Sequence, residues 1–171
     1  RMLPAIYFIF SRRGCDKAVQ ALGNLCLVTE KERGLIRLCL TTFIEKNSEA
    51  VRDGIHPEAL LRGIASHHAG VLPAWKELIE ELFQQGLLKV VFATETLAAG
   101  INMPARSTVI SSLSKRTDGG HRSLMGSEFL QMSGRAGRRG LDSKGYVVTM
   151  QTRFEGAREA AHLATVSADP L

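Results

Sequence analysis

The residues best suited to chemistry lie in the segment 131–140, which has the sequence QMSGRAGRRG. If a helix runs through this segment from Ser127, then Gln131, Arg135 and Arg138 fall on one stripe of it. Two guanidinium groups and an amide on a single face suit a highly charged oxyanion such as a triphosphate. The neighbouring glycines would let a ligand or another backbone approach closely. The alternative is a solvated basic helix end, because cations near a helix C-terminus are favourable in any case.

The elements that must position these residues alternate between strand-like and helix-like patterns. Short apolar runs predict strands, and apolar residues at helical spacing predict helices between them. The expected strands are 5–10, 64–68, 87–93, 107–112 and 145–150, and the expected helices are 16–25, 29–47, 57–63, 73–86 and 154–164. This alternation predicts an α/β fold with three layers, in which helices cover both faces of a mostly parallel central sheet.

Three polar clusters directly follow expected strands, namely Ser11–Arg13, His67–Gly70 and Thr94–Thr96. Ligands of such sheets bind beyond the carboxyl ends of the strands. We therefore expect the three clusters to lie along one edge of the sheet.

Local patterns also predict what several single residues do. Thr29 and Glu32 have the spacing of a capping box at the start of a helix. His67 and His68 are neighbours on a strand and so point to opposite sides, which argues against a shared metal ion, and we expect no metal site. Trp75 fits the apolar face of its helix and is expected in the core rather than as a platform for base stacking.

The three cysteines are Cys15, Cys26 and Cys39, which is an odd number without a C-x-x-C pair. Each lies in an apolar stretch, so we expect buried, reduced thiols and a reducing compartment. There is no membrane-spanning apolar run and no signal-peptide pattern in the sequence. We therefore expect a cytoplasmic or organellar protein that is not secreted.

The composition is that of an ordinary globular domain, with 171 residues, 44% of them apolar and 23% charged. The net charge is +5, and it arises between Gly100 and Lys144, where eight basic and three acidic residues occur. A basic half favours a phosphate-rich partner, with a solvated surface as the alternative. We expect one domain, 1–171, excised from a longer protein, with its last ~15 residues leading to the next domain.

Three blocks of the chain resemble motifs four, five and six of superfamily-two helicases. They are Phe8–Arg13 (FIFSRR), Val91–Arg106 (VFATETLAAGINMPAR) and the segment 131–140. The variants FATETLAAGINMPAR and QMSGRAGRRG, together with HHAGVLP at 67–73, resemble the DExH-box RNA helicases of the superkiller type. The resemblance covers most of the chain from Ala5 to Met150.

This resemblance implies the second RecA-like domain of an ATP-dependent RNA helicase. In that family ATP lies between two RecA-like domains, and nucleic acid lies across both. The phosphate-binding loop G-x-x-x-x-G-K-[ST] and the Asp-Glu-x-His box are not found in this sequence. They belong to the first domain, which would also hold Mg²⁺, so we expect the isolated chain to be inactive alone. The implied partners are single-stranded RNA, bound without sequence preference, the first RecA-like domain, and RNA-decay or RNA-processing proteins, but no membrane.

The resemblance implies roles for the nucleotide-binding residues. Arg138 would be the arginine finger that stabilises charge on the γ-phosphate. Arg135 would hold the same phosphate or support Arg138, and Gln131 would bond a phosphate oxygen or the surroundings of the attacking water. Gly100 would allow close approach of the backbone to the nucleotide, with a turn glycine as the alternative, and Asn102 belongs to the same binding set.

The nucleic-acid contacts implied by the resemblance come from the three strand-end clusters: Ser11, Arg12, Arg13, His68, Gly70, Thr94 and Thr96. Hydroxyl groups and free helix amides at such positions can bind a backbone phosphate. Simple helix capping by the threonines and surface solvation of the Ser11 cluster are the alternatives. The polar segment 114–123, which contains Lys115 and Arg122, is expected to be a mobile RNA-contacting loop or a disordered solvated loop.

Two other functions have to be weighed. A DNA-repair helicase of related type uses similar motifs, and competition between RNA and DNA strands would separate the two. A nucleic-acid-binding module that kept the fold without catalysis is the other, and the intact set of Gln131, Arg135 and Arg138 argues against it.

Overall fold

Within the part of the chain that the structure describes, the central sheet has five parallel strands. The computed structural model describes residues 2–48, 55–97, 102–153 and 155–166. The strands are β1 (Ala5–Phe8), β2 (Ile64–His67), β3 (Val90–Ala93), β4 (Ser107–Ile110) and β7 (Tyr146–Thr149), in the order β2-β3-β1-β4-β7. Ala5 is in register with both Val90 and Ser107, so β1 lies at the centre of the sheet. The α/β class and the parallel sheet are confirmed.

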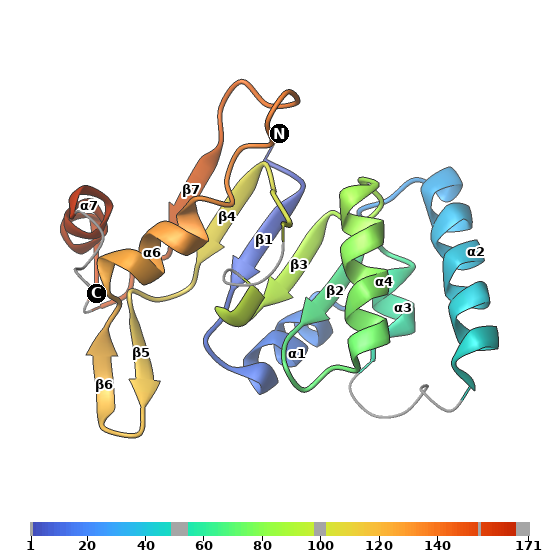
Figure 1. Ribbon diagram of the computed structural model, residues 1–171, viewed down its shortest axis with the longest axis horizontal. Coiled ribbons are helices and arrows are strands. Elements are labelled where there is room, and N and C mark those ends of the chain that lie inside the picture. The colour runs from blue at the N-terminus through green and yellow to red at the C-terminus, as the bar shows by residue number, and fades with distance from the viewer. Residues whose placement is uncertain (1, 49–54, 98–101, 154, 167–171) are drawn as a thin grey trace.

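Helices lie on both faces of this sheet (Figure 1). They are α1 (Arg12–Ala21), α2 (Glu30–Lys46), α3 (Pro57–Leu60), α4 (Pro73–Gln84), α6 (Gly126–Ser133) and α7 (Ala157–Thr165). The helices α4 and α6 cover one face, where α2 packs against α4 and α7 against α6, while α1 lies on the opposite face. The result is the expected three-layer arrangement.

Alternation along the strands divides the core between these two faces. Ile6 and Phe8 of β1 pack in the larger cluster, which contains the buried side chains of α2, α4 and α6. Tyr7, between them, faces α1 with Phe92, and the two rings lie 5.5 Å apart. Successive strand side chains point to opposite faces, so a buried parallel strand needs apolar residues at every position.

The helix α4 has the apolar face that the sequence predicts. Its five large apolar residues at helical spacing, Trp75, Leu78, Ile79, Leu82 and Phe83, are all buried. The Trp75 ring meets Phe43 of α2 edge to face, with ring centroids 5.3 Å apart, which confirms it as a core residue.

The helix α2 begins at the predicted capping box but turns a different face to the core. The Thr29 hydroxyl accepts the amide of Glu32 at 3.2 Å, and the Glu32 carboxylate accepts the amide of Thr29 at 2.8 Å. Leu35 and Ile44 share the helical spacing of the apolar residues in this segment, but both are exposed. Because α2 packs on α4 and not on the sheet, only a narrow stripe of it is covered.

The polar segment 114–123 is a β-hairpin and not a loop. Strand β5 (Ser114–Thr117) pairs with β6 (Gly120–Ser123) in antiparallel register, and Gly120 closes the turn with a φ of +106°. The sequence has no apolar alternation there to predict strands. Ion pairs made by Lys115 and Arg122, described below, hold the hairpin instead.

The cysteines differ in their surroundings, although all three are free thiols. Cys15 is buried under α1, and burial, helped by the charge of Asp16, raises the pKa of its thiol to about 12. Cys39 is partly buried. Cys26 is exposed, so the expectation of burial was wrong for it. None of the described helices is long and apolar enough to cross a membrane.

The two sides of α2 provide a test of the packing. Ile36 is fully buried, whereas Leu38, two residues on, is 67% exposed. We expect Ile36→Ala to lower the free energy of unfolding by about 2–5 kcal/mol, because it leaves a cavity between α2 and α4. Leu38→Ala, the matched control, should change it by less than about 0.5 kcal/mol. Urea denaturation measures both, and equal losses would contradict this packing.

Candidate nucleotide and nucleic-acid interface

The three strand-end clusters lie along one edge of the sheet. Strands β2, β3 and β1 are neighbours, so the chain leaves all three at the same carboxyl edge. Backbone hydrogen bonds continue past their ends, from the Thr94 amide to the His67 carbonyl at 3.3 Å and from the Ile9 amide to the Ala93 carbonyl at 2.9 Å. The expectation that these clusters converge is confirmed.

Ser11 is the N-cap of α1. Its hydroxyl accepts the amide of Gly14 at 3.1 Å, so α1 begins at Arg12, four residues earlier than expected. Arg12 and Arg13 are exposed in its first turn. The aliphatic stem of Arg12 lies near Gly70. If Gly70 carried a Cβ, that atom would be 3.6 Å from the Arg12 Cδ. The first and second clusters are therefore in contact.

His68 is buried, and its imidazole is held by a network that the sequence did not reveal. The Asp16 carboxylate contacts His68 Nε2 at 3.1 Å, the Ser66 hydroxyl at 2.8 Å and His56 Nε2 at 3.3 Å. Burial raises the pKa of Asp16, but hydrogen bonds from His68, Ser66 and His56 outweigh it and lower the pKa below its ordinary value. This network fixes α1 to β2.

His68 and Gly70, two of the residues predicted to contact nucleic acid, are hydrogen-bonded to each other. Gly70 donates its amide to His68 Nδ1 at 3.1 Å, so this amide is already bonded. Nδ1 must then be unprotonated, and Nε2 carries the hydrogen that is donated to Asp16. With 4% of its surface exposed, His68 is held at the end of β2 by these two hydrogen bonds. His67 points the other way, to Glu80 of α4 at 2.7 Å, as expected for neighbours on a strand.

Thr94 and Thr96 lie close together at the end of β3. Their hydroxyl oxygens are 2.9 Å apart, and the Leu97 amide donates to the Thr94 carbonyl at 3.1 Å. Thr96 is exposed. One hydroxyl of the pair donates to the other, so the pair can still donate one hydrogen to an incoming anion.

The predicted helical stripe of Gln131, Arg135 and Arg138 was wrong. Helix α6 ends at Ser133, and Gly134 is its C-cap. Beyond it the chain forms a parallel bridge between Ala136 and Ala105, in which the Ala105 amide donates to the Arg135 carbonyl at 2.8 Å. Backbone pairing next to β4 satisfies these groups in place of helical hydrogen bonds, so only Gln131 of the three lies on the helix.

Glycines allow this turn, as the sequence suggested. Gly137 has a φ of +89°, and its amide donates to the Ala105 carbonyl at 2.7 Å. A Cβ on Gly145 would lie 2.5 Å from both the Ala136 carbonyl carbon and the Gly137 nitrogen, which no real side chain could do. The close approach expected in this segment is therefore that of another backbone.

Arg138 is held by Asp142, a residue that the sequence reasoning missed. Arg138 donates Nε at 2.8 Å and Nη2 at 2.9 Å to the two carboxylate oxygens, and its amide donates to the same group at 3.0 Å. The Asp142 side chain is 1% exposed. The hydrogen bonds from Arg138 hold the pKa of the Asp142 carboxyl well below its usual range. The spacing of four residues between Arg138 and Asp142 is the sequence feature that could have predicted this pair.

The nucleotide-binding candidates lie at the opposite edge of the sheet from the clusters after β1, β2 and β3. Asn102 is exposed three residues before Ala105, and its carbonyl accepts Nε2 of Gln84 at 3.4 Å. Ala105 in turn pairs with the chain at Arg135–Gly137, before the amino ends of β4 and β7. Asn102, Arg135 and Arg138 thus share the amino edge. Gly100 lies outside the described residues.

A cluster of four charged residues links the hairpin to the segment after β3 and to α6. Lys115 Nζ donates to Glu95 at 2.6 Å and lies 2.6 Å from Glu128 of α6, which also accepts two hydrogen bonds from Arg122 at 2.7 and 2.9 Å. Burial raises the pKa of Glu128, but the hydrogen bonds from Arg122 and Lys115 outweigh it and lower this pKa to about 2. We call these four residues the hairpin ion cluster.

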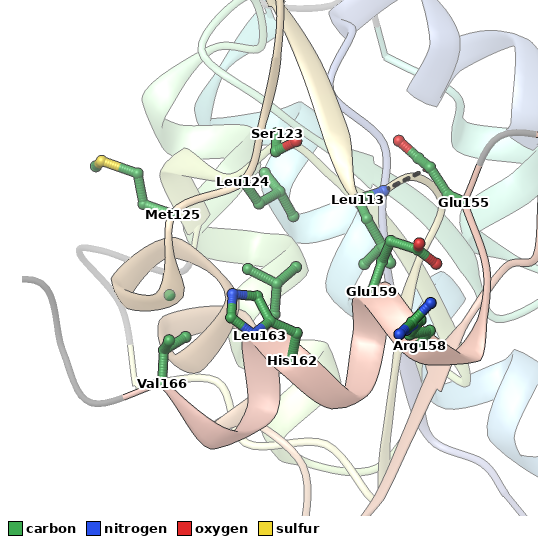
Figure 2. Close-up of a pocket in the computed structure, with 11 residues that line it drawn as sticks. Leu113, Ser123, Leu124, Met125, Glu155, Arg158, Glu159, His162, Leu163 and Val166 are labelled. Carbon is green, nitrogen blue, oxygen red and sulfur yellow. Dashed lines mark hydrogen bonds between the residues drawn. The ribbon is translucent and has the colours of Figure 1, made fainter.

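A pocket of about 620 Å³ lies between the base of the hairpin and α7 (Figure 2). Leu113, Leu124 and Leu163 form its apolar part, and His162 and Glu155 line it as well. The Glu155 carboxylate accepts the Leu113 amide at 2.8 Å, which fixes the chain where it enters the hairpin. Within the described ranges, no group of three acidic, histidine or cysteine side chains is arranged to hold a metal ion.

Comparison with known proteins places the chain in a family. The helicase conserved C-terminal domain matches residues 17–140, which is most of the chain. The chain therefore belongs to the helicase C-terminal domain family, and its three-layer fold is the RecA-like fold of that family.

Several relatives are DExH-box RNA helicases. The chain is 58% identical to the chloroplastic DExH-box ATP-dependent RNA helicase DExH15 of Arabidopsis thaliana over 99% of its own length. It is 46% identical to the probable helicase HelY of Mycobacterium tuberculosis over 99%, and 44% identical to the antiviral helicase SKI2 of Saccharomyces cerevisiae over 87%. It spans only 14%, 19% and 12% of these relatives. The resemblance to the superkiller group is confirmed.

The hairpin ion cluster predicts a pH dependence of stability. Since the pKa of Glu128 falls from 4.5 to about 2 on folding, its ionised form stabilises the fold above pH 4.5, and this contribution is lost as the pH falls toward 2. We expect Glu128→Gln to lower the melting temperature at neutral pH and the difference from wild type to shrink below pH 4.5. Glu45→Gln, on the exposed side of α2, is the control. A Glu128→Gln difference that stays constant down to about pH 3 would contradict the pairing.

Proposed function

We propose that this chain is the C-terminal RecA-like domain of an ATP-dependent RNA helicase, supplying the arginine finger and part of the RNA-binding track. The observation that carries the proposal is the bidentate Arg138–Asp142 pair beside a backbone clamp at Arg135–Gly137. Asp142 accepts the Nε hydrogen and one Nη2 hydrogen, so the plane of the guanidinium is fixed while hydrogens on Nη1 and Nη2 remain for another acceptor. An oriented cation loses little conformational freedom when an anion binds to it.

The nucleotide site is expected at the amino edge of the sheet. Arg135 and Arg138 would hold the phosphates of ATP, with Gln131, Asn102 and Gly100 beside them. Bound ATP supplies the phosphoanhydride bond that is hydrolysed. Arg138 would stabilise the negative charge that develops in the transition state. The opposite face of the nucleotide and Mg²⁺ are assigned to the first RecA-like domain of the complete protein.

The RNA track is expected at the carboxyl edge. Ser11, Arg12 and Arg13 open α1 there, and the hydroxyl pair of Thr94 and Thr96 closes the end of β3. His68 and Gly70 would act by holding the turn beside Arg12 in place. Contacts of these types reach phosphates and not base edges, so binding without sequence preference follows.

The names of relatives support an RNA substrate and intracellular RNA metabolism. DExH15 and the mtr4 protein of Schizosaccharomyces pombe are named ATP-dependent RNA helicases, and Superkiller complex protein 2 of Homo sapiens is named for a complex. We infer partners in RNA decay or processing. A reducing compartment, cytoplasmic or organellar, fits the exposed free thiol of Cys26.

The sharpest test replaces the Arg138 side chain in the complete protein. We expect Arg138→Ala to lower the rate of ATP hydrolysis by about 10³-fold or more and ATP affinity only modestly, because the finger acts mainly in the transition state. RNA affinity without nucleotide should barely change. Arg138→Lys should not rescue hydrolysis, since it lacks the planar fork. Steady-state ATPase kinetics and nucleotide titration measure these effects.

Two controls separate this role from a structural one. Arg139→Ala removes the exposed neighbouring cation and should leave hydrolysis near normal. Thermal unfolding of Arg138→Ala shows how far the fold is destabilised when Asp142 loses its hydrogen bonds from the Arg138 side chain. Abolished RNA binding with near-normal ATP turnover would mean that the segment 131–140 binds a different ligand.

RNA binding by the 171-residue chain should be weak and strongly dependent on salt. Each phosphate contact releases counterions from a single strand, so the affinity should fall steeply between about 50 and 200 mM salt. Arg12→Ala should make this dependence shallower, whereas Arg37→Ala, on the exposed side of α2, should not. Fluorescence anisotropy with a labelled single strand measures both. Salt-independent binding would indicate base stacking instead, and preference for a competing DNA strand would favour a DNA-repair helicase.

A further inference from the structure

The hairpin ion cluster joins the candidate RNA edge to the helix that leads to the arginines. Its two cations, Lys115 and Arg122, balance its two carboxylates, Glu95 and Glu128. Only Lys115 contacts both carboxylates in these ion pairs, at 2.6 Å each, and its side chain is 13% exposed. Of the two carboxylates, Arg122 forms an ion pair only with Glu128.

The geometry points to Lys115 as a positioning residue that couples nucleic-acid binding at Thr94 and Thr96 to the placement of α6 and of the arginine segment beyond it. This inference rests on the proposed function, because it links the two sites named there. A cation shared between two carboxylates is a physical basis for such coupling, since a weaker bond to one partner permits a stronger bond to the other.

The first arm of the link is Glu95. It lies between Thr94 and Thr96, the two residues whose hydroxyls form a hydrogen bond, and its side chain is 39% exposed. A phosphate that binds these hydroxyls brings negative charge next to the Glu95 carboxylate. The phosphate repels Glu95 and attracts Lys115, so the pair between them changes when the strand binds.

The second arm is Glu128, in the first turn of α6. Besides Lys115 and Arg122, its carboxylate accepts the Met125 amide at 2.8 Å, so it is bound to the start of the helix. Phe129 and Met132, on the same helix, are buried in the core. Helix α6 therefore responds as a rigid unit, and its far end continues directly into the backbone bridge at Ala136.

The test compares two substitutions that each remove one cation from Glu128. Lys115→Met keeps the apolar stem but loses contact with both carboxylates, whereas Arg122→Met, the matched control, leaves Lys115–Glu95 intact. Nitrogen-15 heteronuclear spectra of the 171-residue chain are recorded while a uridine oligonucleotide is added. Glu95→Gln, which weakens the other arm, is a second variant that does not depend on how Lys115→Met folds.

In wild type and Arg122→Met, we expect RNA to shift amide signals both at Thr94–Leu97 and at Gln131–Arg138. In Lys115→Met and Glu95→Gln, the shifts at Thr94–Leu97 should remain and those at Gln131–Arg138 should be lost. Lys115→Arg should restore them. In the complete protein, the ratio of ATP hydrolysis with RNA to hydrolysis without RNA should fall by about 5-fold or more in Lys115→Met.

The outcomes distinguish the two proposals. Persistent shifts at Gln131–Arg138 in both Lys115→Met and Glu95→Gln would overturn the coupling while leaving the RNA edge in place. Absence of any shift at Thr94–Leu97 in wild type would overturn the proposed RNA edge, and the coupling with it. Equal loss in Arg122→Met and Lys115→Met would assign the effect to Glu128 alone and overturn the role of the shared cation.

Discussion

The parallel hydrogen-bond ladder from β2 to β7 determines where every candidate residue lies. Because all five strands run the same way, residues that follow a strand lie at one edge and residues that precede a strand lie at the other. Ser11 and Thr94 follow β1 and β3, whereas Ala105 and Arg138 precede β4 and β7. Strands of four residues separate the two edges by about 13 Å, so the two sets of residues lie at separate places on the domain.

Much of this arrangement could be predicted from the sequence, because the relevant signals are local. Apolar runs identified the strands, the Thr29 capping box identified the start of α2, and helical spacing identified the whole buried face of α4. The convergence of Ser11, Gly70 and Thr94 needed one further assumption, that alternating strands and helices form a parallel sheet. That assumption follows from the chirality and length of the connections and not from any single residue.

The features that could not be predicted depend on contacts between distant segments. The helical spacing in the sequence continues through Arg135, but the helix ends at Ser133, where the chain turns to pair Ala136 with Ala105. This pairing partner is 31 residues away in the sequence. The hairpin 114–123 has no apolar alternation, and its ion pairs with Glu95 and Glu128 are made to residues outside the hairpin. The Asp16 network likewise joins residues up to 52 positions apart. No local pattern contains such partners.

The same contacts change what the charge pattern means. Eight basic residues between Gly100 and Lys144 suggested a phosphate-binding surface. In the fold, Lys115 and Arg122 are bound to Glu128, and Arg138 and Arg106 face Asp142. A cation already paired attracts a phosphate less over distance, but its orientation is fixed by its partner. Four of the eight basic residues in this half are therefore better suited to holding charge in a fixed position than to attracting a polyanion by an overall field.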